Sequence, residues 1–214
     1  MTRRILARTA PATALAAALV AVLVAATFAS PARAAVRDAA PSAVSTPAGA
    51  RAASSATALP SKRQWLADTR AAMYGSRSYV GHRVARGGHR LAVNFDIDNT
   101  SLATYYDRGA AVPVTLRFAR YARSHGVALL FNTGRRRDRL SGVARSLRRV
   151  GYGVRELCGR RPGEALTHGK QRCRRHFRAE GYTLIANVGN RSTDFTGGGY
   201  ERAFRLPSYG NRLG

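Results

Sequence analysis

The sequence predicts an α/β domain in which a parallel sheet carries helices on both faces. Short apolar runs typical of buried strands alternate with segments typical of helices, and glycines separate many of them. Such alternation favours parallel strands joined by right-handed crossovers. Polar clusters directly follow several of the apolar runs. Because ligands bind beyond the carboxyl ends of the strands in such sheets, these clusters form the candidate site.

The elements follow in order after residue 62. Strands are predicted at the apolar runs 91–95, 127–131, 154–157, 183–188 and 203–206. A helix over 62–73 is predicted from an apolar stripe that includes Trp65 and Met73, and Pro113 suits the first turn of a helix over 113–123. Further helices are predicted over 138–150 and 170–180, each stopped by a glycine, whereas the Gly- and Arg-rich residues 75–89 are predicted to be an irregular connection.

The first 61 residues are predicted to lie outside the domain of residues 62–214. Residues 1–34 combine an arginine-rich start, an apolar run over 12–29 and a small-residue cleavage site at Ala32-Arg33-Ala34, which is typical of a secretory signal peptide. An uncleaved membrane anchor is the alternative, although an alanine-rich run drives insertion poorly. Residues 35–61 are rich in Ala, Ser, Pro and Thr and are predicted to be a disordered linker.

These features predict a secreted, extracellular protein without stable membrane association after cleavage. The general secretory (Sec) route is favoured over the twin-arginine route, at which Arg3 and Arg4 only hint. Secreted proteins commonly use cysteine pairs as disulfides, so a Cys158–Cys173 bridge is predicted, with two buried free thiols as the alternative.

The chain is strongly basic, with 36 basic and 11 acidic residues and a formal net charge of +25. All of the basic residues except Lys62 and Lys170 are arginine. This charge would attract polyanions non-specifically at low salt, and a solvated positive surface is the alternative interpretation. The arginines are scattered, without a dense basic block interleaved with aromatic residues, so no specific nucleic-acid partner is predicted.

Two carboxylates follow the first predicted strand, in the run Asp96-Ile97-Asp98-Asn99-Thr100. Residues i and i+2 of a strand lie on one face, so Asp96 and Asp98 are expected on the same side. Like charges this close repel, so a chain that keeps both usually has a cation between them or a proton to transfer. The pair suggests phosphoryl transfer, in which Asp96 attacks phosphorus and Asp98 serves as general acid and base. The alternative is a turn, which Asp, Asn and Thr favour.

With the polar clusters placed, the sequence resembles the haloacid dehalogenase-like (HAD) superfamily of phosphohydrolases. The family pattern is DxDxT, a Ser or Thr at a strand end, a Lys, and then G-D-x-x-x-D. Residues 96–100, Thr133, Lys170 and the run from Gly189-Asn190 to Asp194 are similar to these elements in order. More narrowly, residues 96–106 and 204–207 resemble class B and plant-type acid phosphatases. The resemblance implies a Rossmann-like, HAD-like fold.

The resemblance also implies a role for each matched residue. Asp96 would be the nucleophile, and Asp98 the general acid and base. Thr133, Gly134 and Lys170 would bind the phosphoryl group, with Lys170 opposing the charge that develops during transfer.

A magnesium ion is the implied cofactor, with Asp96, the Asp98 backbone carbonyl, Asn190 and Asp194 as the implied metal residues. Asn190 departs from the family, which usually has an aspartate there. An amide oxygen can bind a metal without contributing charge, so weaker affinity is expected and Asp194 must compensate. The alternative for Asn190 is a turn residue in a Gly-rich loop.

Little room for a cap remains between Asp98 and Pro113, so the domain is expected to be nearly capless, with an open site. The predicted function is that of a secreted, magnesium-dependent, acid phosphatase-like phosphomonoesterase that acts on small-molecule phosphate monoesters through an aspartyl phosphate. One alternative is a weakly active or non-catalytic relative that binds phosphate or polyanions. Another is a secreted nucleic-acid-binding protein whose aspartates are structural.

Overall fold

Five parallel strands form a sheet in residues 58–213, the part of the chain that the computed structural model describes. The predicted signal peptide and most of the predicted linker lie outside the described residues. The strands are β1 (Leu91–Phe95), β2 (Ala128–Arg136), β3 (Glu156–Arg160), β4 (Thr183–Gly189) and β5 (Arg202–Arg205). Their order across the sheet is β3-β2-β1-β4-β5.

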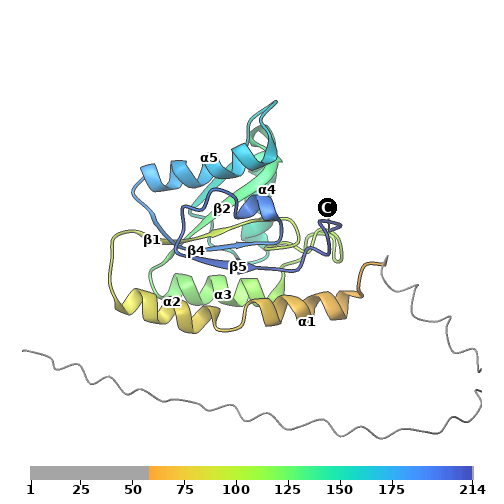
Figure 1. Cartoon of the computed structure of the whole chain (residues 1–214), viewed down its shortest axis with the longest axis horizontal. Helices are drawn as coiled ribbons and strands as arrows, with labels where there is room; N and C mark the ends of the chain where they lie inside the picture. Colours follow the sequence, from red (N-terminus) through yellow and green to blue (C-terminus); the bar gives the residue numbers. More distant parts are fainter. Residues whose placement is uncertain (1–57, 214) are drawn as a thin grey trace, which may run out of the picture. The chain divides into compact units, whose positions relative to one another are not determined.

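Helices cover both faces of this sheet, as predicted. They are α1 (Lys62–Ala72), α2 (Ser76–Ala85), α3 (Pro113–Ser124), α4 (Leu140–Arg149) and α5 (Leu166–Ala179), with short 3-10 turns at η1 (Arg137–Arg139) and η2 (Ser192–Asp194). Figure 1 shows α5 on one side of the sheet and α2 and α3 on the other. None of the described helices is long and apolar enough to cross a bilayer.

The centre of the sheet is apolar because β1 is buried along its whole length. On one face, Phe95 of β1 stacks on Phe131 of β2 with ring centroids 5.6 Å apart and also contacts Phe118 of α3. On the other face, Phe177 of α5 packs with Leu130 of β2 in a smaller buried cluster. A strand that is buried on both faces is a nearly continuous apolar run, and β1 could be predicted because only Asn94 interrupts it.

The strand order reverses at β1, and this reversal positions the site. The chain adds β2 and then β3 on one side of β1 and later returns to add β4 and β5 on the other side. The loops after β1, β2 and β4 therefore meet at the carboxyl edge of adjacent strands. Ligands bind at such topological switch points in open α/β sheets.

Helix α2 is a correction, because residues 75–89 were predicted to be irregular. Gly75 has a φ of 72° and separates α1 from α2, and Val80 of α2 is completely buried. Tyr79 also donates a hydrogen bond from its hydroxyl to the Ile185 carbonyl of β4 at 2.8 Å. These are long-range contacts, so tertiary packing supports a helix that its Gly- and Arg-rich sequence did not indicate.

The other elements lie close to their predicted positions, with shifts that affect the site. Strand β2 continues to Arg136 instead of ending at 131, and α5 begins at Leu166 instead of 170. Lys170 therefore lies in the second turn of α5, not at its start. A disulfide joins Cys158 of β3 to Cys173 of α5 and ties this helix to the edge of the sheet.

Candidate active site

Four of the predicted site residues, Asp96, Asp98, Gly134 and Lys170, line one cavity at the carboxyl edge of the sheet. Asp96 and Asp98 follow β1, Thr133 and Gly134 lie in the last part of β2, and Lys170 reaches in from α5. The cavity has a volume of about 270 Å³. Its walls are Asp96, Asp98, Gly134, Arg135, Arg160, Leu166, Lys170 and Arg191.

Lys170 is the buried cation of this site, with only 3% of its surface exposed. Its Nζ donates a hydrogen bond to Asp96 Oδ1 and another, 2.7 Å long, to the Asn132 carbonyl. Asp194 Oδ1 lies 2.7 Å away in an ion pair, although it accepts no well-aligned hydrogen bond. Burial lowers the pKa of Lys170, but the two carboxylates outweigh it and hold that pKa above its ordinary value. The ammonium group therefore stays charged at neutral pH.

Asp96 is a buried carboxylate whose backbone is fixed on both sides. Its N–H donates to the Val188 carbonyl of β4 at 2.8 Å, and its carbonyl accepts from Ser101 Oγ at 2.7 Å. Burial raises the pKa of Asp96 to about 7, and the Asp194 charge adds to the rise while Lys170 opposes it. Within the described residues no hydrogen bond reaches Asp96 Oδ2, so this oxygen is available to the cavity that Asp96 lines.

Asp98 lies at the more open side of the cavity, with a third of its side chain exposed (33%). Arg135 binds it through two hydrogen bonds, from Nη2 to Oδ1 at 2.5 Å and from Nε to Oδ2 at 3.0 Å. Such a fork-on-carboxylate pair is among the stronger hydrogen-bonded contacts in proteins. Arg135 thus occupies the carboxylate that the sequence predicts to be the general acid and base.

Thr133 and Gly134 follow the buried part of β2. The register that pairs Phe95 with Phe131 brings Thr133 level with the residues just after β1. Thr133 Oγ1 accepts a hydrogen bond from the Arg135 N–H at 3.2 Å, which leaves its own proton to donate. Gly134 lines the cavity at a close approach, since an added Cβ would lie 2.6 Å from Leu166 Cδ1.

Asp194 forms hydrogen bonds within its own loop, the loop that follows β4. Its Oδ2 accepts hydrogen bonds from the Asn190 and Arg191 N–H groups, at 3.1 and 2.9 Å. Gly189 is required here, because a Cβ would lie 2.5 Å from Asp194 Oδ2. Asp194 therefore contacts Lys170 with one oxygen and shapes its own loop with the other.

Besides the wall residues Arg135, Arg160, Leu166 and Arg191, two residues that support the site were not predicted. Asn132 donates from Nδ2 to the Lys170 carbonyl at 2.8 Å, and Arg174, which is only 2% exposed, donates to the carbonyls of Asp194 (2.7 Å), Thr196 and Gly198 (2.8 Å). Asn132 directly precedes Thr133, so its position next to a matched residue was a usable signal. Arg174 had only its spacing of four residues from Lys170 to distinguish it in an arginine-rich chain.

The oxygen atoms of the site fit a weakly held hard cation. No group of three or more His, Cys, Asp or Glu side chains that could hold a metal occurs between residues 58 and 213. Asn190 Oδ1, however, has only a long 3.5 Å contact from Thr100 Oγ1, so its carbonyl remains able to bind a further group. Asp96 Oδ2 and Asn190 Oδ1 are oxygen donors of the kind that Mg²⁺ prefers, but they bring only one negative charge.

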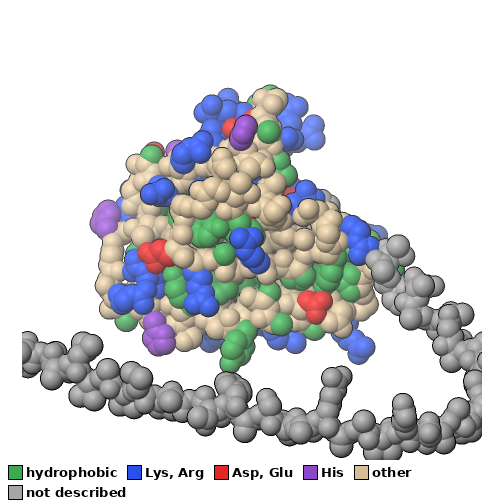
Figure 2. Space-filling model, in the orientation of Figure 1, with side chains coloured by type: hydrophobic (Ala, Val, Ile, Leu, Met, Phe, Trp, Pro, Cys, Tyr) green, Lys and Arg blue, Asp and Glu red, His purple; other side chains and the backbone are tan. Residues whose placement is uncertain are grey.

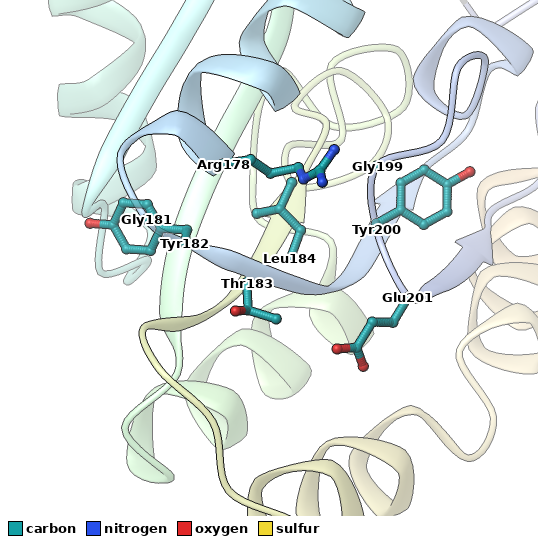
Figure 3. Close-up of a pocket in the computed structure, with 8 residues that line it drawn as sticks. All are labelled: Arg178, Gly181, Tyr182, Thr183, Leu184, Gly199, Tyr200 and Glu201. Carbon is teal, nitrogen blue, oxygen red and sulfur yellow. The ribbon is translucent and has the colours of Figure 1, made fainter.

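A larger cavity of about 560 Å³ lies elsewhere and shares no wall residue with the Asp96 cavity. It surrounds Thr183 and Leu184, at the start of β4 and therefore at the opposite edge of the sheet. Figure 3 shows its Tyr182 and Tyr200 side chains pointing away from each other. Its one carboxylate, Glu201, is held by Arg83 at 2.6 and 2.8 Å. These groups do not converge on a reacting atom, so we place the chemistry at the Asp96 cavity.

The model of the HAD superfamily, subfamily IIIB (acid phosphatase), matches residues 106–212, which is half of the chain. The chain belongs to this family. The match includes Thr133, Lys170 and Asp194 and begins after Asp98. Family membership confirms the predicted superfamily, and it confirms the assignment of this chain to the phosphatases.

Two solved structures share the fold of this HAD phosphatase. The class C acid phosphatase from Bacillus anthracis has a TM-score of 0.57 and 17% identity, over 69% of this chain and 79% of that one. The same protein with tungstate bound gives 0.52 and 18%, over 67% and 83%. A search of curated proteins found no significant match. The structures confirm the α/β, HAD-like fold predicted from the sequence.

Proposed function

We propose that this HAD phosphatase hydrolyses phosphate monoesters through a covalent aspartyl phosphate on Asp96, with Mg²⁺ as cofactor, outside the cell. Family membership supports the phosphomonoesterase activity itself. The observation that carries the mechanism is the buried Asp96 carboxylate held against the buried Lys170 ammonium group in a cavity at the topological switch point. A fixed cation beside a carboxylate nucleophile suits phosphoryl transfer, in which positioning and charge stabilisation provide most of the catalysis.

In the first step, an oxygen of the ionised Asp96 carboxylate attacks the phosphorus atom of the ester. The bond from phosphorus to the alcohol oxygen breaks, and Asp98 gives its proton to that oxygen. In the second step, Asp98 takes a proton from water, the resulting hydroxide attacks phosphorus, and inorganic phosphate leaves with Asp96 regenerated. Lys170 stays charged throughout and opposes the negative charge of the phosphoryl oxygens.

Arg135 must release Asp98 before this proton can move. Its two hydrogen bonds occupy both Asp98 carboxylate oxygens. Arg135 also lines the cavity, so the phosphoryl oxygens of a bound ester are a competing partner for the same guanidinium group. Transfer of Arg135 from Asp98 to the substrate would leave Asp98 able to exchange its proton.

Members of the family generally use a divalent metal ion, and the oxygen donors here fit a hard cation such as Mg²⁺. Asp96, the backbone carbonyl of Asp98 and Asn190 would hold it. When bound, the ion would neutralise charge on the phosphoryl group. Asp194 would contribute through Lys170 and through the Asn190 loop, because contacts with these groups occupy both of its carboxylate oxygens. The neutral Asn190 predicts weak binding of the ion.

The proposal of secretion rests on the signal-like residues 1–34, and the Cys158–Cys173 bridge supports it because disulfides persist in oxidising compartments. Expression of the full chain in a bacterial host, followed by mass analysis of protein from the medium, tests it. A mature chain that begins near residue 35 is expected. Retention of the whole chain in the cell would contradict secretion.

Hydrolysis of p-nitrophenyl phosphate, with and without Mg²⁺, tests the activity. Asp96→Asn is expected to abolish turnover, whereas Asp107→Asn is the matched control, since Asp107 is exposed and pairs with Lys62 away from the cavity. Mass analysis of protein quenched in acid during turnover should detect one phosphoryl group on a peptide that contains Asp96. Full activity of Asp96→Asn would exclude the covalent route.

A further inference from the structure

A second cavity opens directly beside the Asp96 cavity. It has a volume of about 480 Å³, and Gly134, Arg135 and Arg160 form part of the wall of both cavities. Its remaining walls are Arg136, Arg139, Gly142 and Val143, from the end of β2, η1 and the start of α4. A ligand whose reacting group lies at Asp96 can therefore extend past Gly134 into a space larger than the reaction cavity itself.

The walls of this combined groove carry more positive charge than the described acidic side chains balance. Arg135 pairs with Asp98, and Arg136 pairs with Asp138 at 2.8 Å. In the described part of the chain no carboxylate pairs with Arg139, Arg160 or Arg191, which line one cavity or the other. Guanidinium groups gathered in this way repel one another unless an anion lies between them.

Arg160 keeps hydrogen-bonding capacity that the described residues do not use. Its Nη1 donates to the Glu164 carbonyl at 3.1 Å, but its Nε is buried without any hydrogen-bond partner. Within the described residues its Nη2 also has no acceptor, and unlike Nε it is not enclosed, so it can donate to an oxygen of a bound anion. Arg160 belongs to the wall shared by the two cavities, so such a ligand would bridge them.

The chemistry of the walls also limits the kind of ligand. Neither cavity has an aromatic side chain in its wall, and Leu166 and Val143 are the apolar groups that the two walls contain. The groove thus offers no platform on which a base or another ring could stack. Arginine forks match phosphate oxygens in pairs, so charge and hydrogen bonding would provide most of the recognition.

We propose that this phosphatase prefers small non-aromatic phosphomonoesters that carry a second phosphate group. Arg139 and Arg160, with Arg136, bind the phosphate that is not hydrolysed, while the other phosphate lies at Asp96. This proposal rests on the proposed function, because it identifies the substrate class of the same site. It goes beyond that function because a monoester dianion alone would leave the second cavity empty.

The test compares fructose 6-phosphate with fructose 1,6-bisphosphate, followed as phosphate release at low ionic strength. The value of kcat/KM is expected to be about tenfold higher for the bisphosphate, which is the effect of one charge-assisted hydrogen-bonded pair. The presence of two hydrolysable phosphates would by itself explain only a twofold increase. Arg139→Gln should lower this ratio several-fold. Arg148→Gln is the matched control, because Arg148 is exposed on α4, the helix that follows Arg139, and lines neither cavity. Equal efficiency for the two esters, or a ratio that Arg139→Gln leaves unchanged, would overturn the proposal.

A binding measurement separates this proposal from the proposed function. Calorimetric titration of Asp96→Asn with each fructose phosphate reports the second-phosphate site without turnover. Tighter binding of the bisphosphate that is lost in Asp96→Asn/Arg139→Gln supports the site even if the wild-type chain hydrolyses neither ester. Hydrolysis of both esters with equal binding supports the phosphatase and refutes the second site.

Discussion

Asn132 and Lys170 hold each other at two points. Lys170 Nζ donates to the Asn132 carbonyl at 2.7 Å, and Asn132 Nδ2 donates to the Lys170 carbonyl at 2.8 Å. The pair connects β2 to α5 and fixes both the backbone and the ammonium group of the lysine. The distance from Lys170 to Asp96 therefore depends on a residue that does not itself line the cavity.

Asn132→Ala tests this dependence. The variant keeps the backbone acceptor for Nζ but removes the side-chain donor to the buried Lys170 carbonyl, so we expect a loss of about 0.5–1.5 kcal/mol in the free energy of unfolding. We also expect kcat to fall while KM changes little, because the lysine is displaced while the arginines of the cavity wall are kept. Urea unfolding and steady-state kinetics measure the two effects. A variant with normal kcat would show that Asn132 only supports the fold.

Lys170→Met removes the cation between two buried carboxylates. Breaking a buried ion pair costs about 3–5 kcal/mol because it leaves uncompensated charge. The pKa of Asp96 is already raised, and loss of the lysine raises it further. An acid whose pKa is raised in the folded state destabilises the fold as pH rises. The loss of unfolding free energy in Lys170→Met, relative to wild type, should therefore be large at pH 7 and smaller in acid. Urea unfolding of wild type and variant at neutral and at acid pH measures this loss. A loss of stability that is greater in acid than at neutral pH would contradict the prediction.

Glu164 predicts a separate acid-sensitive contribution to stability. Hydrogen bonds from Arg172, at 2.8 and 3.0 Å, lower the pKa of this carboxyl to about 2, and the Arg161 N–H adds to the effect. Because the folded-state pKa lies below the ordinary value of 4.5, the stabilisation is present above pH 4.5 and is lost as pH falls toward 2. Glu164→Gln should therefore lower Tm above pH 4.5 and match wild type near pH 2.

Glu180→Gln is the control for that experiment, since Glu180 is an exposed residue at the end of α5. Thermal unfolding across the pH range should give the same profile for this variant and wild type. An equal loss of Tm in both variants would mean that net charge, and not the Arg172 contact, determines the profile.

The disulfide should contribute to stability in proportion to the loop that it closes. Cys158 and Cys173 are 15 residues apart, for which the chain-entropy model gives about 3 kcal/mol. Cys158→Ser/Cys173→Ser should therefore unfold at lower urea concentration. Its activity should fall too, because Lys170 lies one turn before Cys173 on the helix that the bond holds. Unfolding with and without a reductant provides the comparison, and equal midpoints for the oxidised and reduced wild type would refute the contribution.

The sequence predicted the parts of the fold that depend on local pattern. Strand β1 could be predicted from Leu91 to Phe95 because its burial on both faces gives an apolar run that only Asn94 interrupts. Helix α2 could not be predicted, because it depends on tertiary contacts. Tyr79 bonds to Ile185, 106 residues away in the chain, and Val80 packs in the main hydrophobic core. Local propensity does not contain such contacts.

The site follows the same division. Asp96, Thr133 and Lys170 occur in the same order along the chain as the matching elements of the HAD sequence pattern. Their convergence could therefore be expected before the order of the strands in the sheet was known. Arg174 could not be recognised, because its role depends on three carbonyl groups of a loop that only the folded chain brings to it. The capture of Asp98 by Arg135 is likewise a matter of side-chain position that spacing does not specify.

The pairing of β1 with β4 makes assembly of the site depend on completion of the sheet. Leu91 lies opposite Thr183, so the central strand acquires this neighbour only after most of the domain has been synthesised. Fragments that end before β4 contain Asp96, Asp98 and Lys170 but lack the loop that places Asp194 beside Lys170. Recovery of turnover during refolding should therefore follow this late, long-range step and lag behind the recovery of helical signal.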